Sequence, residues 1–227
     1  MKRRSNIIYK FNKKQKPDNK PDNKPDNKPD NNDEHDGDNS DIKVVDNHIW
    51  FNADVCNDSI QCLIHAIHIK NIELHKIKNK FTNFEITPKP IFLHINSYGG
   101  DLFEAMAGID AIINSDIPIH TIIEGTAASA ATLLSIVGEK RYITKHSYML
   151  IHQLSSSMWG TMAELEDDHH NNKALMERLY KLYTEYSDLT KPKLKKILKK
   201  DIWWDAEKCI EVGLVDEIYK EDYGVDI

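Results

Sequence analysis

The chain has 227 residues, of which 40% are hydrophobic and 29% charged, and its formal net charge is −6. This length accommodates one sizeable domain with a tail rather than two full domains. The charge balance gives no electrostatic reason to expect nucleic acid as a partner. No run approaches the roughly 18 apolar residues that a membrane helix needs, so we expect no membrane association.

The cysteines and the N-terminus indicate a compartment. Cys56, Cys62 and Cys209 form no CxxC pair, and the basic residues 1–16 lack the apolar region of a secretory signal. An odd cysteine count in such a chain predicts a reducing environment without a disulfide framework. We expect a cytoplasmic location, with a mitochondrial one as the alternative.

Residues 16–31 repeat the unit Lys-Pro-Asp-Asn four times in succession. Each unit is polar, balances one Lys against one Asp and contains Pro, so it cannot bury apolar area to offset the entropy of ordering. We predict a disordered low-complexity tail over residues 1–42 and a folded domain over residues 43–227. The tail is either a spacer or docking segment, or the product of replication slippage at a tolerant terminus.

The first half of the folded part predicts strands separated by helices. Residues 43–51 indicate a strand with a turn at Asp46-Asn47, and the apolar spacing of residues 57–71 indicates a helix capped by Asn57 or Asp58. Further strands are predicted at 91–95 and at 120–124, the latter stopped by Gly125, with a helix over 102–114 between them.

The second half continues this alternation. The predicted elements are a helix that opens within 127–132 and ends near 138, strands at 141–144 and 148–151, and helices at 163–187, 193–199 and 206–212, the last closed by Gly213. Strands that alternate with helices predict an α/β fold of repeated βαβ units with right-handed crossovers and a mainly parallel sheet.

The long helix at 163–187 has an apolar stripe formed by Leu165, Leu175, Leu179, Leu182 and Tyr186. In a monomer this stripe would be exposed, which indicates a homo-oligomer. The alternative is that the stripe packs on its own domain.

Two predicted strand ends carry residues suited to chemistry, because ligands gather at the carboxyl ends of strands in open α/β sheets. The first, Asn-Ser-Tyr-Gly-Gly at 96–100, has paired glycines that could present backbone N–H groups, although most such pairs are simply turns. The second, Gly-Thr-Ala-Ala-Ser-Ala-Ala at 125–131, places Ser129 at the positive start of a helix, where an oxyanion would be stabilised. Taken locally, Ser129 is more simply interpreted as a helix cap.

These two segments are followed by Tyr-Met-Leu-Ile-His-Gln at 148–153 and by Trp-x-x-Ala-Glu-x-x-x-x-x-Gly-Leu-Val-Asp at 203–216. In this order and spacing the four segments resemble the proteolytic subunit of the Clp protease, the ClpP family (peptidase family S14), from about residue 42 to residue 218. The resemblance implies a ClpP/crotonase-like fold whose long helix protrudes as a handle. It also implies two stacked rings of seven subunits that enclose the active sites.

Carried over by position, the resemblance implies Ser129 as the nucleophile, His152 as the general base and Asp201 as the acid that orients the imidazole. It implies the amides of Gly100 and Ala130 as the oxyanion hole. Asp205, four residues from Asp201, is the alternative acid. We expect no cofactor and no metal, because the histidine pairs that could be considered as ligands lack a Cys or carboxylate set: His65 with His68, and His169 with His170.

Three departures from the family pattern stand out. Tyr98 replaces the usual Pro before the two glycines. The N-terminal segment that forms axial loops, and helps to dock an AAA+ ATPase unfoldase, has no evident counterpart, so this partnership is left open. Residues 99–105 and the Trp near the acid are closer to the phage-type branch, which includes capsid-maturation proteases and leaves a virion-associated location as an alternative.

The expected function is that of a serine endopeptidase that hydrolyses unfolded polypeptides or peptides inside an oligomeric chamber. The alternatives are a virion-maturation protease of the same family and a catalytically silent ring subunit. The enoyl-CoA hydratase relatives share the fold but lack the Ser/His pair.

Overall fold

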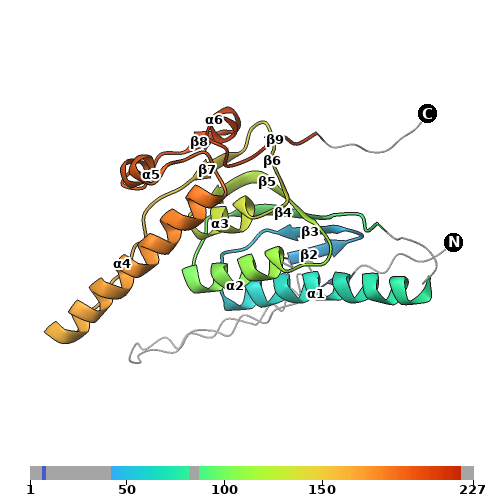
Figure 1. The fold of residues 1–227 in the computed structure, drawn as a ribbon, viewed down its shortest axis with the longest axis horizontal. Helices are drawn as coiled ribbons and strands as arrows, with labels where there is room; N and C mark the ends of the chain where they lie inside the picture. The colour runs from blue at the N-terminus through green and yellow to red at the C-terminus, as the bar shows by residue number, and fades with distance from the viewer. Residues whose placement is uncertain (1–6, 9–41, 82–86, 221–227) are drawn as a thin grey trace, which may run out of the picture.

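The computed structural model describes residues 7–8, 42–81 and 87–220, which form a mixed α/β fold (Figure 1). In chain order the elements are β1 (Ile7–Ile8), β2 (Ile42–Val45), β3 (His48–Phe51), α1 (Asn57–Lys80), β4 (Ile91–Ser97), α2 (Leu102–Ile113), β5 (Ile119–Ala128), α3 (Ala130–Ile136), β6 (Lys140–Ile143), β7 (Tyr148–Leu150), α4 (Met162–Glu185), α5 (Lys191–Ile197), β8 (Trp204–Asp205), α6 (Ala206–Glu211) and β9 (Glu217–Ile218).

The sheet runs in the order β1-β2-β3-β4-β5-β6-β9, with β7 beside the far end of β5 and β8 beside β7. The pairs β3–β4, β4–β5, β5–β6, β5–β7 and β6–β9 are parallel, while β1–β2, β2–β3 and β7–β8 are antiparallel. The predicted α/β class with a mainly parallel sheet is confirmed. None of the helices in the described part of the chain is long and apolar enough to cross a membrane.

The predicted first strand at 43–51 is in fact a hairpin. Strands β2 and β3 pair around a turn at Asp46, whose φ of 50° lies in the left-handed region that Asp and Asn tolerate. Ile42 begins β2 and is buried. Strand β1 pairs with β2, and the remainder of the predicted disordered tail lies outside the described residues.

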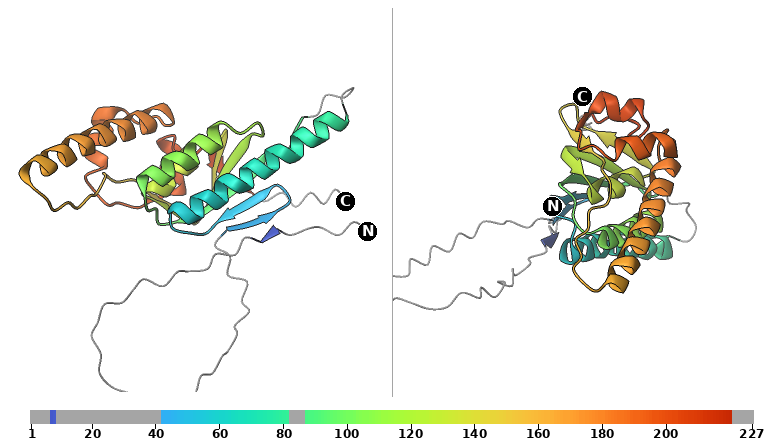
Figure 2. Two further views of the ribbon diagram at one scale, coloured as in Figure 1. Left: turned by 90° about the horizontal axis from the view of Figure 1, so that it is seen from below. Right: turned by 90° about the vertical axis from the view of Figure 1, so that its left-hand side faces the viewer.

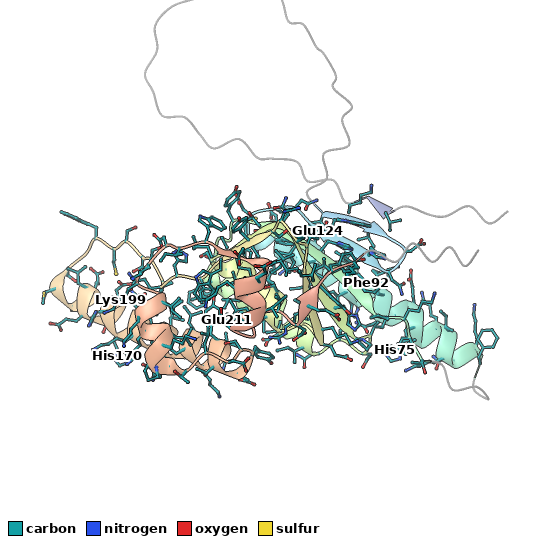
Figure 3. All side chains as sticks on the ribbon, turned by 90° about the horizontal axis from the view of Figure 1, so that it is seen from above. His75, Phe92, Glu124, His170, Lys199 and Glu211 are labelled. Carbon is teal, nitrogen blue, oxygen red and sulfur yellow. The ribbon has the colours of Figure 1, made fainter. Side chains whose placement is uncertain are left out.

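Helices α1 and α2 lie side by side on one face of the sheet (Figure 2). Successive strand residues point to opposite faces, so Ile49 and Leu93 are fully buried beneath these helices. The opposite face carries rings instead: Trp50 stacks on His94 at a centroid distance of 4.8 Å, and His94 Nδ1 lies 2.7 Å from Glu124 Oε1. Figure 3 labels Glu124, together with Phe92 on β4, on this side of the molecule.

Helix α1 extends to Lys80, well beyond the predicted end at residue 71, and its N-cap is Cys56 rather than Asn57 or Asp58. The Cys56 amide donates to Ser59 Oγ at 3.1 Å. The C-terminal part of α1 runs past the sheet, and Ile77 there is 46% exposed. Apolar periodicity therefore underestimated the helix, because its last turns have little core to face.

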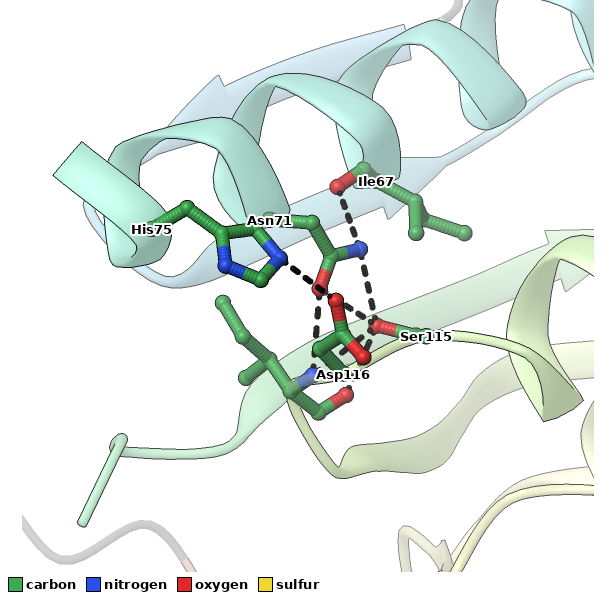
Figure 4. Close-up of polar contacts among 6 residues, drawn as sticks. Ile67, Asn71, His75, Ser115 and Asp116 are labelled. Atoms are coloured by element: carbon green, nitrogen blue, oxygen red, sulfur yellow. Dashed lines mark hydrogen bonds and ion pairs between the residues drawn. The ribbon is translucent and has the colours of Figure 1, made fainter. Parts of the chain in front are cut away.

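A polar cluster fastens α1 to the loop between α2 and β5 (Figure 4). The amide group of Asn71 donates to Ser115 Oγ at 3.1 Å and accepts from the Ile117 amide at 3.1 Å. One turn further along, His75 Nε2 lies 2.7 Å from Asp116 Oδ2. These contacts fix the point at which β5 enters the sheet.

Strand β5 does not stop at Gly125, as predicted, but continues to Ala128. Gly125 adopts a φ of 80°, and its amide donates to Ser147 Oγ at 2.6 Å. Before this glycine β5 pairs with β6, and after it with β7. The glycine thus marks a change of partner within one strand, and the final three residues of β5 are aligned with β7.

Helix α4, predicted at 163–187, spans Met162–Glu185. Its C-terminal half packs on the domain, where Leu179, Leu182 and Tyr183 are buried. Its N-terminal half projects from the body of the molecule, and Met162 and Leu165 there are 69% and 40% exposed (Figure 1). The apolar stripe is therefore divided between an internal contact and an exposed end.

Candidate active site

The candidate nucleophile and base follow two neighbouring parallel strands. In the β5–β7 pair, Ala128 is aligned with Leu150. The chain therefore leaves both strands at the same edge of the sheet, with Ser129 after one and His152 after the other. Their side chains meet, and Ser129 Oγ lies 2.7 Å from His152 Nε2.

The backbone of Ser129 is strained, with φ 53° and ψ −127°. Such a conformation is uncommon for a residue with a side chain and tends to persist where the surroundings over-determine it. Here the Ser129 amide donates to Leu150 O at 2.9 Å, and the Thr132 amide donates to Ser129 O at 3.1 Å. The hydroxyl makes no capping hydrogen bond to α3, so Ser129 is not an ordinary helix cap.

A buried hydroxyl pair supports this turn from behind. Thr132 Oγ1 donates to Ser129 O at 2.6 Å, so its single proton is used there. The hydrogen bond of 2.6 Å between Thr132 Oγ1 and Tyr183 Oη must therefore have the tyrosine as donor. Burial raises the pKa of Tyr183, which keeps this donor protonated. Helix α4 thus helps to position the serine. The sequence gives no sign of this link, because Thr132 and Tyr183 are 51 positions apart.

The candidate acid, Asp201, lies in the segment that precedes β8. Strand β8 runs antiparallel to β7, with Tyr148 aligned with Asp205 and Met149 with Trp204. Continuing this register past the end of β7 brings His152 opposite Asp201. The Asp201 Oδ1 atom lies 3.5 Å from His152 Nδ1, and the aspartate side chain is 77% exposed.

Asp205, the alternative acid, has another task. Its Oδ1 accepts a hydrogen bond of 2.8 Å from the Lys208 amide and so caps α6. Of the two carboxylates, the structure therefore places Asp201 beside the imidazole.

Both glycines are required by close packing, Gly99 against the serine turn and Gly100 against the backbone of Val55. A Cβ on Gly99, whose φ is 98°, would lie 2.6 Å from Ala128 O and 2.7 Å from the Cβ of Ser129. A Cβ on Gly100, whose φ is 150°, would lie 2.1 Å from Val55 O. No side chain fits at either position without a backbone shift.

The amides of Gly100 and Ala130 are available as donors. Val55 bridges the glycine loop by donating to Gly99 O at 2.8 Å and accepting from the Asp101 amide at 2.7 Å. The intervening Gly100 amide is used by neither bond. Within the described residues, no acceptor is found for the amide of Gly100 or for that of Ala130. Both residues line the same cavity as Ser129 and His152.

This cavity has a volume of about 470 Å³, which lies within the usual range of about 300–1,000 Å³ for ligand sites. Its walls come from the glycine loop and the start of α2, from α3, from the segment after His152 and from α4. It is therefore a cleft that begins at the Ser129 hydroxyl and extends along the long helix.

Two aromatic side chains from the loops that carry site residues are in contact. The rings of Tyr98 and Trp203 meet edge to face, with centroids 6.3 Å apart and an interplanar angle of 89°. Tyr98 directly precedes the glycine pair, and Trp203 lies two residues after Asp201. The sequence drew attention to each residue separately but carried no signal that they are in contact.

The histidine pairs do not form part of a metal-binding group. Within the part of the chain that the structure describes, no group of three or more His, Cys, Asp or Glu side chains could hold a metal ion. His75 on α1 and His170 on α4 lie at opposite ends of the molecule (Figure 3). Burial raises the pKa of the free thiol of Cys209 to about 12, so this residue is unsuited to act as a nucleophile.

The Clp protease family model matches residues 63–222, well over half of the chain. The chain belongs to the Clp protease family. Among its relatives, ATP-dependent Clp protease proteolytic subunit 2 of Treponema denticola is 32% identical over 134 residues, which cover 58% of this chain and 67% of the relative. Proteolytic subunit 1 of Protochlamydia amoebophila is 30% identical over 149 residues, covering 63% and 72%. Proteolytic subunit 2 of Treponema pallidum is 29% identical over 135 residues, covering 59% and 68%.

Proposed function

We propose that this Clp protease family member is a serine endopeptidase in which Ser129 is the nucleophile, His152 the general base and Asp201 the orienting acid. The observation that carries the proposal is the 2.7 Å contact between Ser129 Oγ and His152 Nε2 on a strained strand-to-helix turn. A hydroxyl held in this way faces the cleft and meets a base without any rearrangement.

In the proposed reaction, Ser129 Oγ attacks the carbonyl carbon of a peptide bond while His152 Nε2 accepts the hydroxyl proton. The tetrahedral intermediate collapses as the imidazolium donates this proton to the departing amine, which leaves an acyl-enzyme. Water, deprotonated by His152, then attacks the ester and releases the new carboxylate and the free serine. The reaction consumes one water and needs no cofactor.

The negative oxygen of both tetrahedral intermediates would be stabilised by the amides of Gly100 and Ala130, which line the cleft beside Ser129. The loss of one such donor typically slows a reaction by about 10²–10³-fold. Asp201 supports the imidazolium from the Nδ1 side. Its distance of 3.5 Å and its exposure make this support weaker than that of a buried acid.

We further propose that the chain assembles with copies of itself and encloses its active sites in a chamber. The relatives are named as subunits of ATP-dependent proteases. The projecting end of α4 and the segment before it expose large apolar side chains: Met158, Trp159, Met162 and Leu165. A second copy would cover this surface, because water-exposed apolar area of this kind favours association. The substrates would be peptides or unfolded polypeptides, and an ATPase partner would supply the latter.

A fluorophosphonate probe tests the chemistry, because it reacts only with an activated serine. We expect covalent labelling of the wild-type protein, none of Ser129→Ala, and strongly reduced labelling of His152→Ala. Ser157→Ala, which changes an exposed serine outside the cleft, is the matched control and should label as the wild type does. Native mass spectrometry of the same samples reports the assembly. Equal labelling of Ser129→Ala, or no labelling of assembled wild-type protein, would reject the proposal.

A further inference from the structure

The wall of the cleft beside Ser129 contains several apolar side chains. Four leucines from three separate segments line it: Leu133 on α3, Leu154 after the histidine, and Leu175 and Leu179 on α4. These side chains can pack against the methylene groups of a substrate side chain that enters beside the scissile bond.

Polar groups stand among these leucines. Asn172 donates from Nδ2 to Asp168 Oδ2 at 2.8 Å and to Ser156 Oγ at 2.8 Å. Both Asp168 and Asn172 are half-buried on α4 and line the cleft. The asparagine therefore fixes one oxygen of the Asp168 carboxylate, and within the described residues the other oxygen accepts no hydrogen bond.

The charges that line the cleft are of one sign. Asp101 and Asp168 are the ionisable lining residues besides His152 and Tyr183, and neither Lys nor Arg is among the described residues of its wall. Asp101 uses Oδ1 to cap α2, by accepting from the Phe103 and Glu104 amides at 2.7 and 3.1 Å. Asp101 is exposed to solvent whereas Asp168 is half-buried, so a charged group of a ligand in the cleft would interact more strongly with Asp168.

We propose, on the basis of the peptidase function proposed above, that this cleft receives the substrate side chain on the acyl side of the cleaved bond and that Asp168 selects Lys or Arg there. A basic side chain combines an apolar stem, which the leucines would cover, with a cationic end, which would pair with Asp168. An apolar side chain would take water from the carboxylate without replacing its hydrogen bonds. A neutral polar side chain of the same length would replace the hydrogen bonds but not the charge. An acidic side chain would meet two like charges.

The test compares fluorogenic peptides that are identical except for the residue before the cleaved bond. Arg and citrulline form the decisive pair, because citrulline keeps the shape and the hydrogen-bonding end but lacks the charge; Leu and Glu complete the set. The variants are Asp168→Asn and, as the matched control, Asp167→Asn, which removes one exposed charge next to Asp168 but outside the cleft wall.

We expect kcat/KM for the Arg peptide to exceed that for the citrulline peptide by about tenfold in the wild type and in Asp167→Asn, and this ratio to fall to about 1 in Asp168→Asn. The Glu peptide should be the poorest wild-type substrate and should improve in Asp168→Asn. Thermal melting of both variants confirms that they remain folded.

Three results would overturn the inference. In the first, the wild-type protein reacts with the fluorophosphonate probe but cleaves the Leu peptide best or does not distinguish Arg from citrulline. The peptidase function would then stand, and the proposed specificity would be rejected. Equal loss of the Arg preference in both variants would show a general charge effect rather than a role for Asp168. Absence of both labelling and cleavage would reject the peptidase function and this inference with it.

Discussion

Gly99 lies so close to Ser129 that a methyl group on its Cα would come within 2.7 Å of the serine Cβ. The glycine loop and the serine turn therefore share one packed surface, and neither can move without the other. This contact also places the Gly100 and Ala130 amides on the same wall of the cleft. The proposed nucleophile and its oxyanion donors thus form one rigid unit.

Gly99→Ala tests this unit. Because the added methyl group meets the backbone at Ala128 O, 2.6 Å away, and φ is 98°, one of the two loops must shift. We expect the rate of fluorophosphonate labelling to fall by about 100-fold or more. Gly160→Ala is the control, since its methyl group would meet only the Glu164 side chain, 2.6 Å from Oε2 and 3.2 Å from Cβ, at a position outside the cleft wall. Labelling of Gly99→Ala at the wild-type rate would contradict the expectation.

Substitution of Asp201 should affect catalysis, whereas substitution of Asp205 should affect stability. Asp201→Asn is expected to lower kcat/KM by about 10²-fold, less than the about 10⁴-fold seen for a buried triad acid, because Asp201 is exposed to solvent. Asp205→Ala is expected to leave kcat/KM unchanged and to lower the free energy of unfolding by about 1 kcal/mol, because α6 loses its cap. Steady-state kinetics and chemical denaturation measure the two effects. If Asp205→Ala lowered kcat/KM and Asp201→Asn did not, Asp205 rather than Asp201 would be the orienting acid.

The contact between Tyr98 and Trp203 joins the loop that precedes the oxyanion donors to the loop that carries Asp201. We expect Tyr98→Ala and Trp203→Ala each to lower kcat/KM. In the double variant the loss of transition-state stabilisation should be smaller than the sum of the two single losses, by a coupling free energy of about 0.5–1 kcal/mol. Tyr98→Phe keeps the ring and should retain the wild-type rate. Strictly additive losses would mean that the pair does not position the site.

The ion pair between Arg141 and Asp216 should make stability depend on pH. Partial burial raises the pKa of Asp216, but hydrogen bonds from Arg141 and its charge outweigh this effect and lower the pKa. A folded-state pKa below the unfolded-state value of about 3.9 stabilises the protein above that value. The stabilisation is lost as the pH falls through the folded-state pKa.

Asp216→Asn is therefore expected to lower the free energy of unfolding by about 1 kcal/mol at pH 7, a modest figure because solvent screens this half-exposed pair. The deficit should shrink as the pH falls below about 4 and the wild-type carboxyl becomes protonated. Denaturant titrations of both proteins across this range measure it. An undiminished deficit at pH 2 would show that the effect is steric rather than electrostatic.

Strong local patterns predicted much of the fold. The apolar periodicity of α2 and α4 and the Gly213 cap after α6 gave helices whose ends agree with the structure within two residues. The sequence failed where a long-range contact overrides a local signal. Gly125 normally interrupts a strand, yet β5 continues past it because β7 replaces β6 as its hydrogen-bonding partner.

By itself the sequence determined the chemical groups and the elements that carry them: a serine among small residues at a strand-to-helix junction, a histidine after a short strand, and paired glycines after another strand. It also determined the alternation of strands and helices, because periodicity and turn chemistry are local properties. The tertiary structure decided which of these groups meet. The antiparallel register of β7 and β8 places Asp201 rather than Asp205 beside His152, and strand register depends on hydrogen bonds between segments that lie far apart in the chain.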